Sequence, residues 1–149
     1  STVNIQNKKA RFEYAIIDEY VAGIQLLGTE IKSIREGKAS IGEAYCVVQY
    51  DEVFLRNSYV DEYENGGHFN HEVRRDRKLL LNRHEITKIH KKLKTKGFTL
   101  IPLNLFVNSK GLAKLKIAVA QGKKLHDKRE SIKDRDNKRQ LDRLKKNFG

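Results

Sequence analysis

Cysteine, proline and long hydrophobic runs are nearly missing from this sequence of 149 residues, which has one cysteine, one proline and no tryptophan. Cys46 has no partner, so no disulfide can form within the chain and an oxidising compartment is not indicated. The longest apolar runs reach only a few residues, whereas a membrane-spanning helix needs about 20. No charged segment followed by an apolar segment opens the sequence, so we expect no secretory signal, no membrane partner and a cytoplasmic protein.

Motifs of catalysis are also missing from the sequence. It has no Gly-rich phosphate loop followed by Lys-Ser/Thr, no dinucleotide fingerprint and no nucleophile elbow. Cys46 lies in a Val-rich segment and is predicted to be a small core residue. The acidic pairs at 18–19 and 61–62 point to opposite faces of an extended chain, which does not suit a hydrolase. We therefore expect that the protein is not an enzyme and needs no cofactor.

The histidines give a weak resemblance to a metal site. His68 and His71 have a spacing found in zinc sites, but zinc needs two further ligands that this spacing does not supply. His84 and His90 are six residues apart on a predicted helix, which is too far round to share one ligand face. Solvated or RNA-contacting histidines and no metal are the favoured interpretation. A metal-dependent nuclease using His68 and His71 is the alternative from another functional class.

What the sequence has in excess is positive charge. Its 31 Lys and Arg residues against 19 Asp and Glu residues give a net charge of +12. Such a charge attracts polyanions over long distances, so nucleic acid is the first candidate partner and an anionic membrane the second. Residues 121–149 contain eleven of the basic and five of the acidic side chains, so this segment carries +6 in about a fifth of the length.

The composition therefore divides the chain into two parts. Residues 121–149 have few large apolar side chains, too few to offset the entropy of ordering the segment alone. Ser131 and Asp134 have the spacing of a capping box, so a helix can form once a partner neutralises the charge. We expect a domain over residues 1–120 and a basic tail over residues 121–149, disordered alone and helical when bound to a partner.

The first 120 residues have mainly β patterning. Apolar and β-branched runs predict five strand segments, which are Tyr14–Leu27, Ala44–Tyr50, Val53–Tyr59, Thr99–Val107 and Leu112–Ala120. The second and third form a hairpin around an Asp51–Glu52 turn, and the last two form a hairpin around residues 108–111. Gly23 is a predicted bulge or bend, and Pro102 predicts an edge or bulged position. Alternation in the last strand places Lys114 and Lys116 on its solvent face.

Two helices interrupt these strands. Thr29–Glu36 is predicted to point Lys32 and Arg35 outward. A longer helix over residues 83–96 begins at a capping box of Asn82 and Glu85. Its outer side is predicted to carry Lys88, Lys91, Lys92, Lys94 and Lys96. About six antiparallel strands with two or three short helices predict a partly open β-barrel of the oligonucleotide-binding type.

Basic residues gather in three stretches. The first is Lys8, Lys9 and Arg11; the second comprises Arg74, Arg75, Arg77 and Lys78, directly before three leucines; the third is the tail. One such stretch alone is typical of a solvated surface. Three of them, interleaved with aromatic residues and a lysine-bearing strand, favour a surface that follows RNA phosphates. Leu80, beside the cations, is interpreted either as a base or sugar contact or, with equal weight, as a core residue.

Five sequence blocks occur in the order found in one protein family. They are Asn7-Lys8-Lys9-Ala10-Arg11, then Ala22-Gly23 with Gly28-Thr29-Glu30-Ile31-Lys32-Ser33-Ile34-Arg35, then Arg77-Lys78-Leu79-Leu80-Leu81, then Lys96-Gly97-Phe98-Thr99-Leu100-Ile101-Pro102-Leu103, and Gly122-Lys123-Lys124-Leu125-His126-Asp127-Lys128-Arg129. With these blocks in register over nearly the whole chain, the sequence resembles the small protein B family, the partners of transfer-messenger RNA.

The resemblance implies a monomeric adaptor that binds the transfer-RNA-like domain of transfer-messenger RNA and delivers it to stalled ribosomes. It also implies a complex with the elongation factor that delivers aminoacyl-tRNA. By position, the resemblance assigns RNA binding to Lys8, Arg11, Glu30, Lys32, Lys78, Leu80, Asn82 and Lys114. The basic patterning adds Lys9, Arg35, Arg77 and Lys116. The residues implied at the decoding region and message channel of the small subunit are Lys123, Lys124, His126, Asp127, Lys128 and Arg129. A general ribosomal or initiation-type RNA-binding barrel is the alternative.

Overall fold

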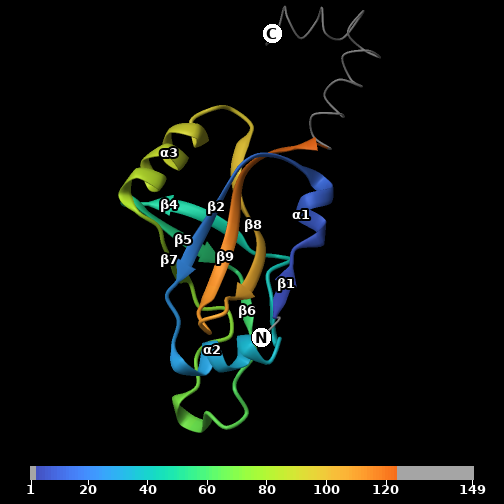
Figure 1. Cartoon of the computed structure of the whole chain (residues 1–149), viewed down its shortest axis with the longest axis vertical. Helices are drawn as coiled ribbons and strands as arrows, with labels where there is room; N and C mark the ends of the chain where they lie inside the picture. Colours follow the sequence, from blue (N-terminus) through green and yellow to red (C-terminus); the bar gives the residue numbers. More distant parts are fainter. Residues whose placement is uncertain (1–2, 124–149) are drawn as a thin grey trace, which may run out of the picture.

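The computed structural model describes residues 3–123 of the chain, which form a large, strongly curved antiparallel sheet, a small two-stranded sheet and three α-helices (Figure 1). In chain order the elements are β1 (Asn4–Gln6), α1 (Lys8–Glu13), β2 (Tyr14–Ile24), α2 (Gly28–Arg35), β3 (Ala39–Ser40), β4 (Tyr45–Gln49), β5 (Glu52–Arg56), β6 (Tyr59–Val60), the 3-10 turn η1 (Gly67–Phe69), β7 (Arg77–Leu80), α3 (Arg83–Leu93), β8 (Phe98–Val107) and β9 (Ala113–Gly122). None of these helices is long and apolar enough to cross a membrane.

The large sheet has seven strands in the order β1-β8-β9-β2-β7-β5-β4. Its outermost strands, β1 and β4, are not paired with each other within residues 3–123, so the sheet curls without closing. The short strands β3 and β6 form a separate pair beside α2. The prediction of a mainly β, partly open barrel with short helices is confirmed, although the strands β1, β3 and β7 were not predicted and β6 was predicted only as the end of the preceding strand.

The β8–β9 hairpin lies between β1 and β2 in the sheet and agrees with its prediction. Its turn is held by Asn108, whose Oδ1 accepts hydrogen bonds from the N–H groups of Lys110 at 3.0 Å and Leu112 at 2.9 Å. Gly111 adopts a φ of +82°, which suits a residue without Cβ. A register shift directly after Pro102 confirms the predicted bulge there, since proline has no N–H to donate to the ladder.

The predicted positions of the bulge in β2 and of the turn between β4 and β5 were wrong. The bulge of β2 lies at Ile17, between Ile16 and Asp18, and Gly23 stays in register with its neighbours on both sides. The β4–β5 turn consists of Tyr50 and Asp51, with φ of 54° and 59°, and Glu52 pairs with Gln49 in the ladder. Positive φ at both loop positions is typical of a type I′ two-residue hairpin loop, and no glycine stands here in the sequence to indicate such a loop.

The main core fills the inside of the curl. It comprises Val53, Leu55, Leu79, Leu105, Leu115, Ile117 and Val119 from the strands, with Ile34 of α2 and Ile89 of α3 packed against them. Cys46 is also buried in this core, as predicted, and burial raises the pKa of its thiol far above the ordinary value.

A second, smaller core lies on the opposite side of β8 and β9. Ala10 of α1 packs there against Ile101, Leu103, Ala118 and Ala120. Helix α1 was not predicted, because a six-residue helix has too few turns to show an apolar period. It begins at Asn7, whose Oδ1 accepts from the Ala10 N–H at 3.2 Å and whose Nδ2 donates to the Pro102 carbonyl at 3.0 Å.

Helix α3 has the predicted capping box, with the Glu85 N–H donating to Asn82 Oδ1 at 2.8 Å. It ends at Leu93, three residues earlier than expected, and Lys92 does not lie on its free side. Instead Lys92 pairs with Asp18 of β2, which also accepts a hydrogen bond from the Tyr20 hydroxyl at 2.7 Å. The hydrogen bonds from Lys92 and Tyr20 lower the pKa of Asp18, so this contact fastens α3 to the sheet.

We expect Asn7→Ala to lower the free energy of unfolding by about 2 kcal/mol, because it removes the cap of α1 and leaves the Pro102 carbonyl without its donor. Urea denaturation of the full chain measures this change. Asn4→Ala on the exposed edge strand β1 is the matched control and should cost less than about 0.5 kcal/mol. Equal effects of the two substitutions would contradict the anchoring role of Asn7.

Candidate nucleic-acid interface

The convex side of the sheet carries a row of residues that lie next to one another across four strands. Leu80 of β7 pairs with Gly23 of β2, Gly23 with Lys114 of β9, and Lys114 with Phe106 of β8. Because side chains alternate along a strand and the neighbours of these residues fill the main core, the row points away from that core. The sequence reasoning named Leu80 and Lys114 but did not place them side by side.

Gly23 creates a gap in the middle of this row. A Cβ at this position would lie 3.2 Å from the Leu80 Cβ, closer than two such atoms normally approach. The gap continues into a groove of about 350 Å³ whose walls include Leu80, Lys114, Leu112 and Arg35. Leu80 is 50% exposed, so its interpretation as a core residue is wrong, and a contact with a base or sugar stays a prediction.

Lysines flank this row on both sides. Lys78 lies two residues before Leu80 and pairs with Glu52, while Lys116 lies two residues after Lys114, with its Nζ 3.6 Å from Glu19 Oε1. Lys114 itself has no acidic partner within residues 3–123. Its ammonium group is therefore available to an anion at the centre of the row.

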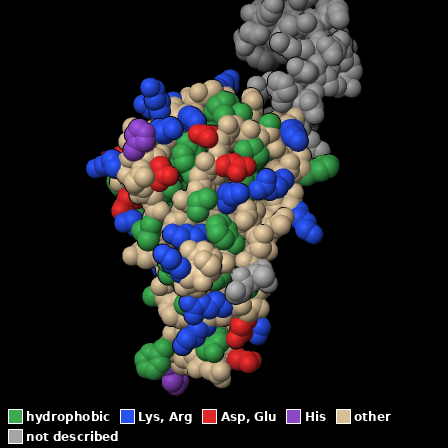
Figure 2. Space-filling model, in the orientation of Figure 1, with side chains coloured by type: hydrophobic (Ala, Val, Ile, Leu, Met, Phe, Trp, Pro, Cys, Tyr) green, Lys and Arg blue, Asp and Glu red, His purple; other side chains and the backbone are tan. Residues whose placement is uncertain are grey.

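Helix α1 adds further cations on the same side of the sheet. Ala10 contacts Ala118 and Ala120, which alternate with the core residues of β9 as Lys114 and Lys116 do. Lys8, Lys9 and Arg11 are exposed around that contact. Figure 2 shows Lys and Arg side chains, with hydrophobic ones between them, spread over the face on which β2 and β9 lie. This pattern suits RNA, which offers phosphates and apolar base faces.

Helix α2 presents Lys32 and Arg35 at the edge of this face. Both are exposed, as predicted. The Lys32 Nζ lies 5.5 Å from the centre of the Tyr63 ring. The Arg35 Nη2 donates to the Gly111 carbonyl at 2.8 Å, so this side chain ties α2 to the β8–β9 turn and thereby holds two walls of the groove together.

Two of the predicted RNA-binding residues are placed where they cannot touch RNA. Glu30 and Arg77 are both 0% exposed, and their side chains pair with each other, with 2.8 Å from Arg77 Nε to Glu30 Oε2. Glu30 Oε1 also accepts from Arg75 Nη2 at 2.6 Å and from the Leu27 N–H at 2.8 Å. Direct contact with RNA is therefore the wrong role for Glu30 and Arg77; they position α2 against β7.

The surroundings of Glu30 favour its charged form. Burial alone would raise the pKa of its carboxyl, but the hydrogen bonds from Arg75 and Leu27 and the charge of Arg77 outweigh burial and lower that pKa. The Arg77 Nη1 donates to Ser58 Oγ at 2.9 Å and to the Arg75 carbonyl at 2.9 Å. The buried guanidinium of Arg77 thus has both a counter-charge and hydrogen-bond acceptors for its N–H groups, as a buried charge requires.

Asn82 and the histidines have local structural roles that the sequence reveals only in part. Asn82 is exposed, yet its side chain already serves as the cap of α3. His71 is only 4% exposed and lies within hydrogen-bond distance of Thr29 Oγ1 (2.8 Å) and the Val60 carbonyl (2.9 Å). The interpretation of His71 as solvated or RNA-contacting is therefore wrong, while His68 is exposed. Within residues 3–123 no cluster of acidic, His and Cys side chains could hold a metal ion.

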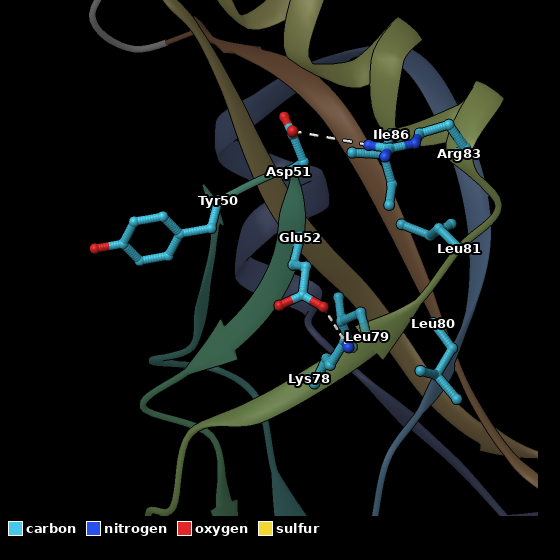
Figure 3. A pocket seen from close by; sticks show the side chains of 9 residues that line it. All are labelled: Tyr50, Asp51, Glu52, Lys78, Leu79, Leu80, Leu81, Arg83 and Ile86. Carbon is cyan, nitrogen blue, oxygen red and sulfur yellow. Dashed lines mark ion pairs between the residues drawn. The ribbon is translucent and has the colours of Figure 1, made fainter.

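A larger hollow, of about 650 Å³, lies beside Leu80 and was not predicted. Figure 3 shows its lining, in which Lys78 faces Glu52 and Arg83 faces Asp51. The Arg83 Nη1 is 3.7 Å from Asp51 Oδ2. Because each cation here has an acidic partner, this hollow offers less free positive charge than the Gly23 groove does.

The residues expected at the ribosome lie almost entirely outside the described part of the chain. Lys123 is exposed directly after β9. Lys124, His126, Asp127, Lys128 and Arg129 are not among residues 3–123. Strand β9 continues to Gly122, which pairs with Tyr14, so the boundary predicted after residue 120 falls inside the sheet.

Comparisons with known proteins identify close relatives of this chain. The family model described as SmpB protein matches residues 4–147. An SsrA-binding protein of Flavobacterium psychrophilum is 59% identical over 99% of this chain and 98% of its own length, and one of Allorhizobium ampelinum is 55% identical over 95% and 89%. A solved structure described as "tmRNA-SmpB: a journey to the center of the bacterial ribosome" is similar with a TM-score of 0.68 and 40% identity, over 81% of this chain and 85% of the other.

We expect Glu30→Ala to lower the free energy of unfolding by about 3 to 5 kcal/mol, because it leaves Arg77 buried without a counter-charge. The control is Glu52→Ala, which removes the partner of Lys78 at a half-exposed pair and should cost no more than about 1 kcal/mol. Denaturant titration of both variants checks the difference, and similar midpoints would contradict it.

The same carboxyl predicts a pH dependence. Since the pKa of Glu30 is lower in the folded chain than its ordinary value of 4.5, its contribution is complete above that value. It is lost as the pH falls through the lowered pKa. The free energy of unfolding of the unaltered chain should therefore fall more steeply below pH 4.5 than that of Glu30→Gln. Parallel curves for the two proteins would show that Glu30 does not titrate in this way.

Proposed function

The chain belongs to the SmpB protein family, and on that premise we propose that it is an RNA-binding adaptor that binds the transfer-RNA-like domain of transfer-messenger RNA. It delivers this RNA to stalled ribosomes in trans-translation. The protein acts by binding and carries out no catalytic step of its own. Its site of action is the cytoplasm, where ribosomes translate.

The observation that carries this proposal is the row of Leu80, Gly23 and Lys114 on an exposed sheet face. A cation and an apolar side chain on either side of a gap can contact a phosphate and an unstacked base at the same time. The loops of a folded RNA expose both groups close together. Buried Glu30 and Arg77 hold α2 beside this row, so that Lys32 and Arg35 extend the surface. Lys8, Lys9 and Arg11 extend it at the other end.

The tail has a separate task in this proposal. Residues from Lys123 onward, including Lys124, His126, Asp127, Lys128 and Arg129, enter the message channel and decoding region of the small subunit. A basic segment that folds on binding suits a groove between phosphates. The elongation factor that delivers aminoacyl-tRNA completes the delivered complex, in which this chain is a monomer.

We expect the full chain to bind transfer-messenger RNA tightly at near-physiological salt, even in a large excess of bulk transfer RNA. Leu80→Ala should weaken this binding about tenfold, since alanine loses apolar surface that a base would cover, at about 0.8 kcal/mol for each buried CH₂ group. Gel-shift titration with competitor measures both. The control is Ile17→Ala, another half-exposed apolar residue (45% exposed), which should leave the affinity unchanged.

Weak binding that transfer RNA competes away equally would overturn this proposal. In that case the positive surface would serve a general ribosomal RNA-binding protein without preference for a transfer-RNA-like fold. Equal losses for Leu80→Ala and Ile17→Ala would show that the row around Gly23 is not the contact surface.

A chain ending after Lys123 should bind transfer-messenger RNA as the full chain does, but should not support tagging of stalled nascent chains. Ending the chain there keeps Gln121 and Gly122, which complete β9. A reconstituted translation assay on a message without a stop codon measures the tagging. Loss of RNA binding together with tagging would contradict the division into a binding domain and a tail.

A further inference from the structure

The hollow beside Leu80 has no role in the proposed function, although it lies next to the groove at Gly23. Its volume of about 650 Å³ is in the range of sites that hold small molecules. Leu80 lines both the hollow and the groove. A nucleotide that follows one bound in the groove can therefore enter the hollow.

The charged residues of the hollow form two pairs, each with an acid beside a cation. Asp51 and Glu52 lie at the β4–β5 turn and at the start of β5, whereas Lys78 lies on β7 and Arg83 is the first residue of α3. Figure 3 shows Asp51 facing Arg83 and Glu52 facing Lys78. Because the charges cancel within each pair, the hollow is better suited to hydrogen-bonding groups than to a phosphate.

The pair of Asp51 and Arg83 leaves room for a ligand. The Arg83 Nη1 lies 3.7 Å from Asp51 Oδ2, and the two side chains are 77% and 68% exposed. Pairs this exposed contribute little to stability, so a ligand can replace the contact at small cost. The second oxygen of Asp51 and the further N–H groups of the Arg83 guanidinium can take part in hydrogen bonds to that ligand.

Apolar side chains line the hollow between these pairs. Leu79 belongs to the main core, and Leu81 and Ile86 pack against that core. The Tyr50 ring projects away from them (Figure 3), so the apolar surface of the hollow is aliphatic. An unstacked RNA base fits such a site, because its flat face packs on apolar atoms while its edge meets polar groups.

The order of acceptors and donors along the pair selects one base. Guanine has two N–H donor groups side by side, at N1 and N2, and these match the two oxygens of a carboxylate. Next along the same edge come O6 and N7, the acceptors to which arginine donates as a fork. The other three RNA bases lack two adjacent N–H donor groups. The arrangement of Asp51 beside Arg83 therefore suits guanine.

We propose that the hollow beside Leu80 binds an unstacked guanine of transfer-messenger RNA. Asp51 accepts from N1–H and the N2 amino group, Arg83 donates to O6 and N7, and Leu81 and Ile86 contact the face of the base. This inference rests on the proposed function, because it takes the RNA to lie on the convex sheet face. Lysines that contact phosphates position an RNA, whereas a contact to a base edge distinguishes one RNA from another.

The test uses the full chain with Asp51→Asn, since asparagine tolerates the φ of 59° at this position. Affinity for transfer-messenger RNA should fall about tenfold, as expected for the loss of one bidentate base contact. Removal of an acid otherwise strengthens binding to a polyanion, so the sign of the change decides the matter. The control is Glu36→Gln, which removes the carboxylate of another exposed pair, 3.3 Å from Lys38 Nζ, and should not weaken binding.

Chemical probing with kethoxal, which reacts at N1 and N2 of unpaired guanine, supplies an independent measurement. At saturating protein, the unaltered chain should protect one guanine of the RNA that reacts again when Asp51→Asn is bound. The slope of log affinity against log salt should be the same for both proteins. Lys114→Gln should instead make the slope less steep by about 0.7 to 0.9, as the loss of one phosphate contact does.

Unchanged or tighter binding by Asp51→Asn would overturn this inference, as would a kethoxal pattern that does not differ between the two proteins. Tight binding of guanosine monophosphate alone would assign the hollow to a free nucleotide and overturn the assignment to an RNA base. In each of these cases the unaltered chain still binds transfer-messenger RNA. Failure of the unaltered chain to bind that RNA would contradict the proposed function itself.

Discussion

The ion pair between Glu30 and Arg77 is the constraint on which the candidate interface depends. It joins α2 to β7 inside the molecule, where neither charge can be left unpaired without a large loss of stability. The backbone of β7 then carries Lys78 and Leu80 on its other side, and α2 carries Lys32 and Arg35 on its free face. A buried interaction thereby fixes the relative positions of four side chains that reach the surface.

The convex sheet face and the basic outer side of α3 depend on different parts of the structure. The convex sheet face gains its shape from pairing between strands, because the register places Leu80, Gly23 and Lys114 side by side. The basic outer side of α3, with Lys88, Lys91 and Lys94, gains its shape from helical periodicity, and the capping box, the Lys92–Asp18 contact and the burial of Ile89 in the main core hold the helix in place. The first surface therefore depends on the register of four strands, whereas the second depends on the placement of a single helix.

Sequence patterns sufficed for the features that depend on local periodicity. The β8–β9 hairpin, the bulge at Pro102 and the capping box of Asn82 and Glu85 were all predicted correctly. The burial of Glu30 and Arg77 could not be predicted from the sequence. An arginine in a basic stretch has the same local sequence pattern whether it binds RNA or a carboxylate 47 positions away in the chain. The same holds for His71 and Lys92, whose partners come from other elements.

The hydrogen bond from Arg35 to the Gly111 carbonyl has an evolutionary consequence. Its acceptor belongs to the main chain, so no substitution at position 111 can delete it, whereas a single substitution at position 35 removes the donor. Position 111 is restricted for another reason, because its φ of +82° disfavours side chains. Inherited loss of this contact by a side-chain change therefore has to come from the arginine, and substitutions elsewhere in the turn leave the acceptor in place.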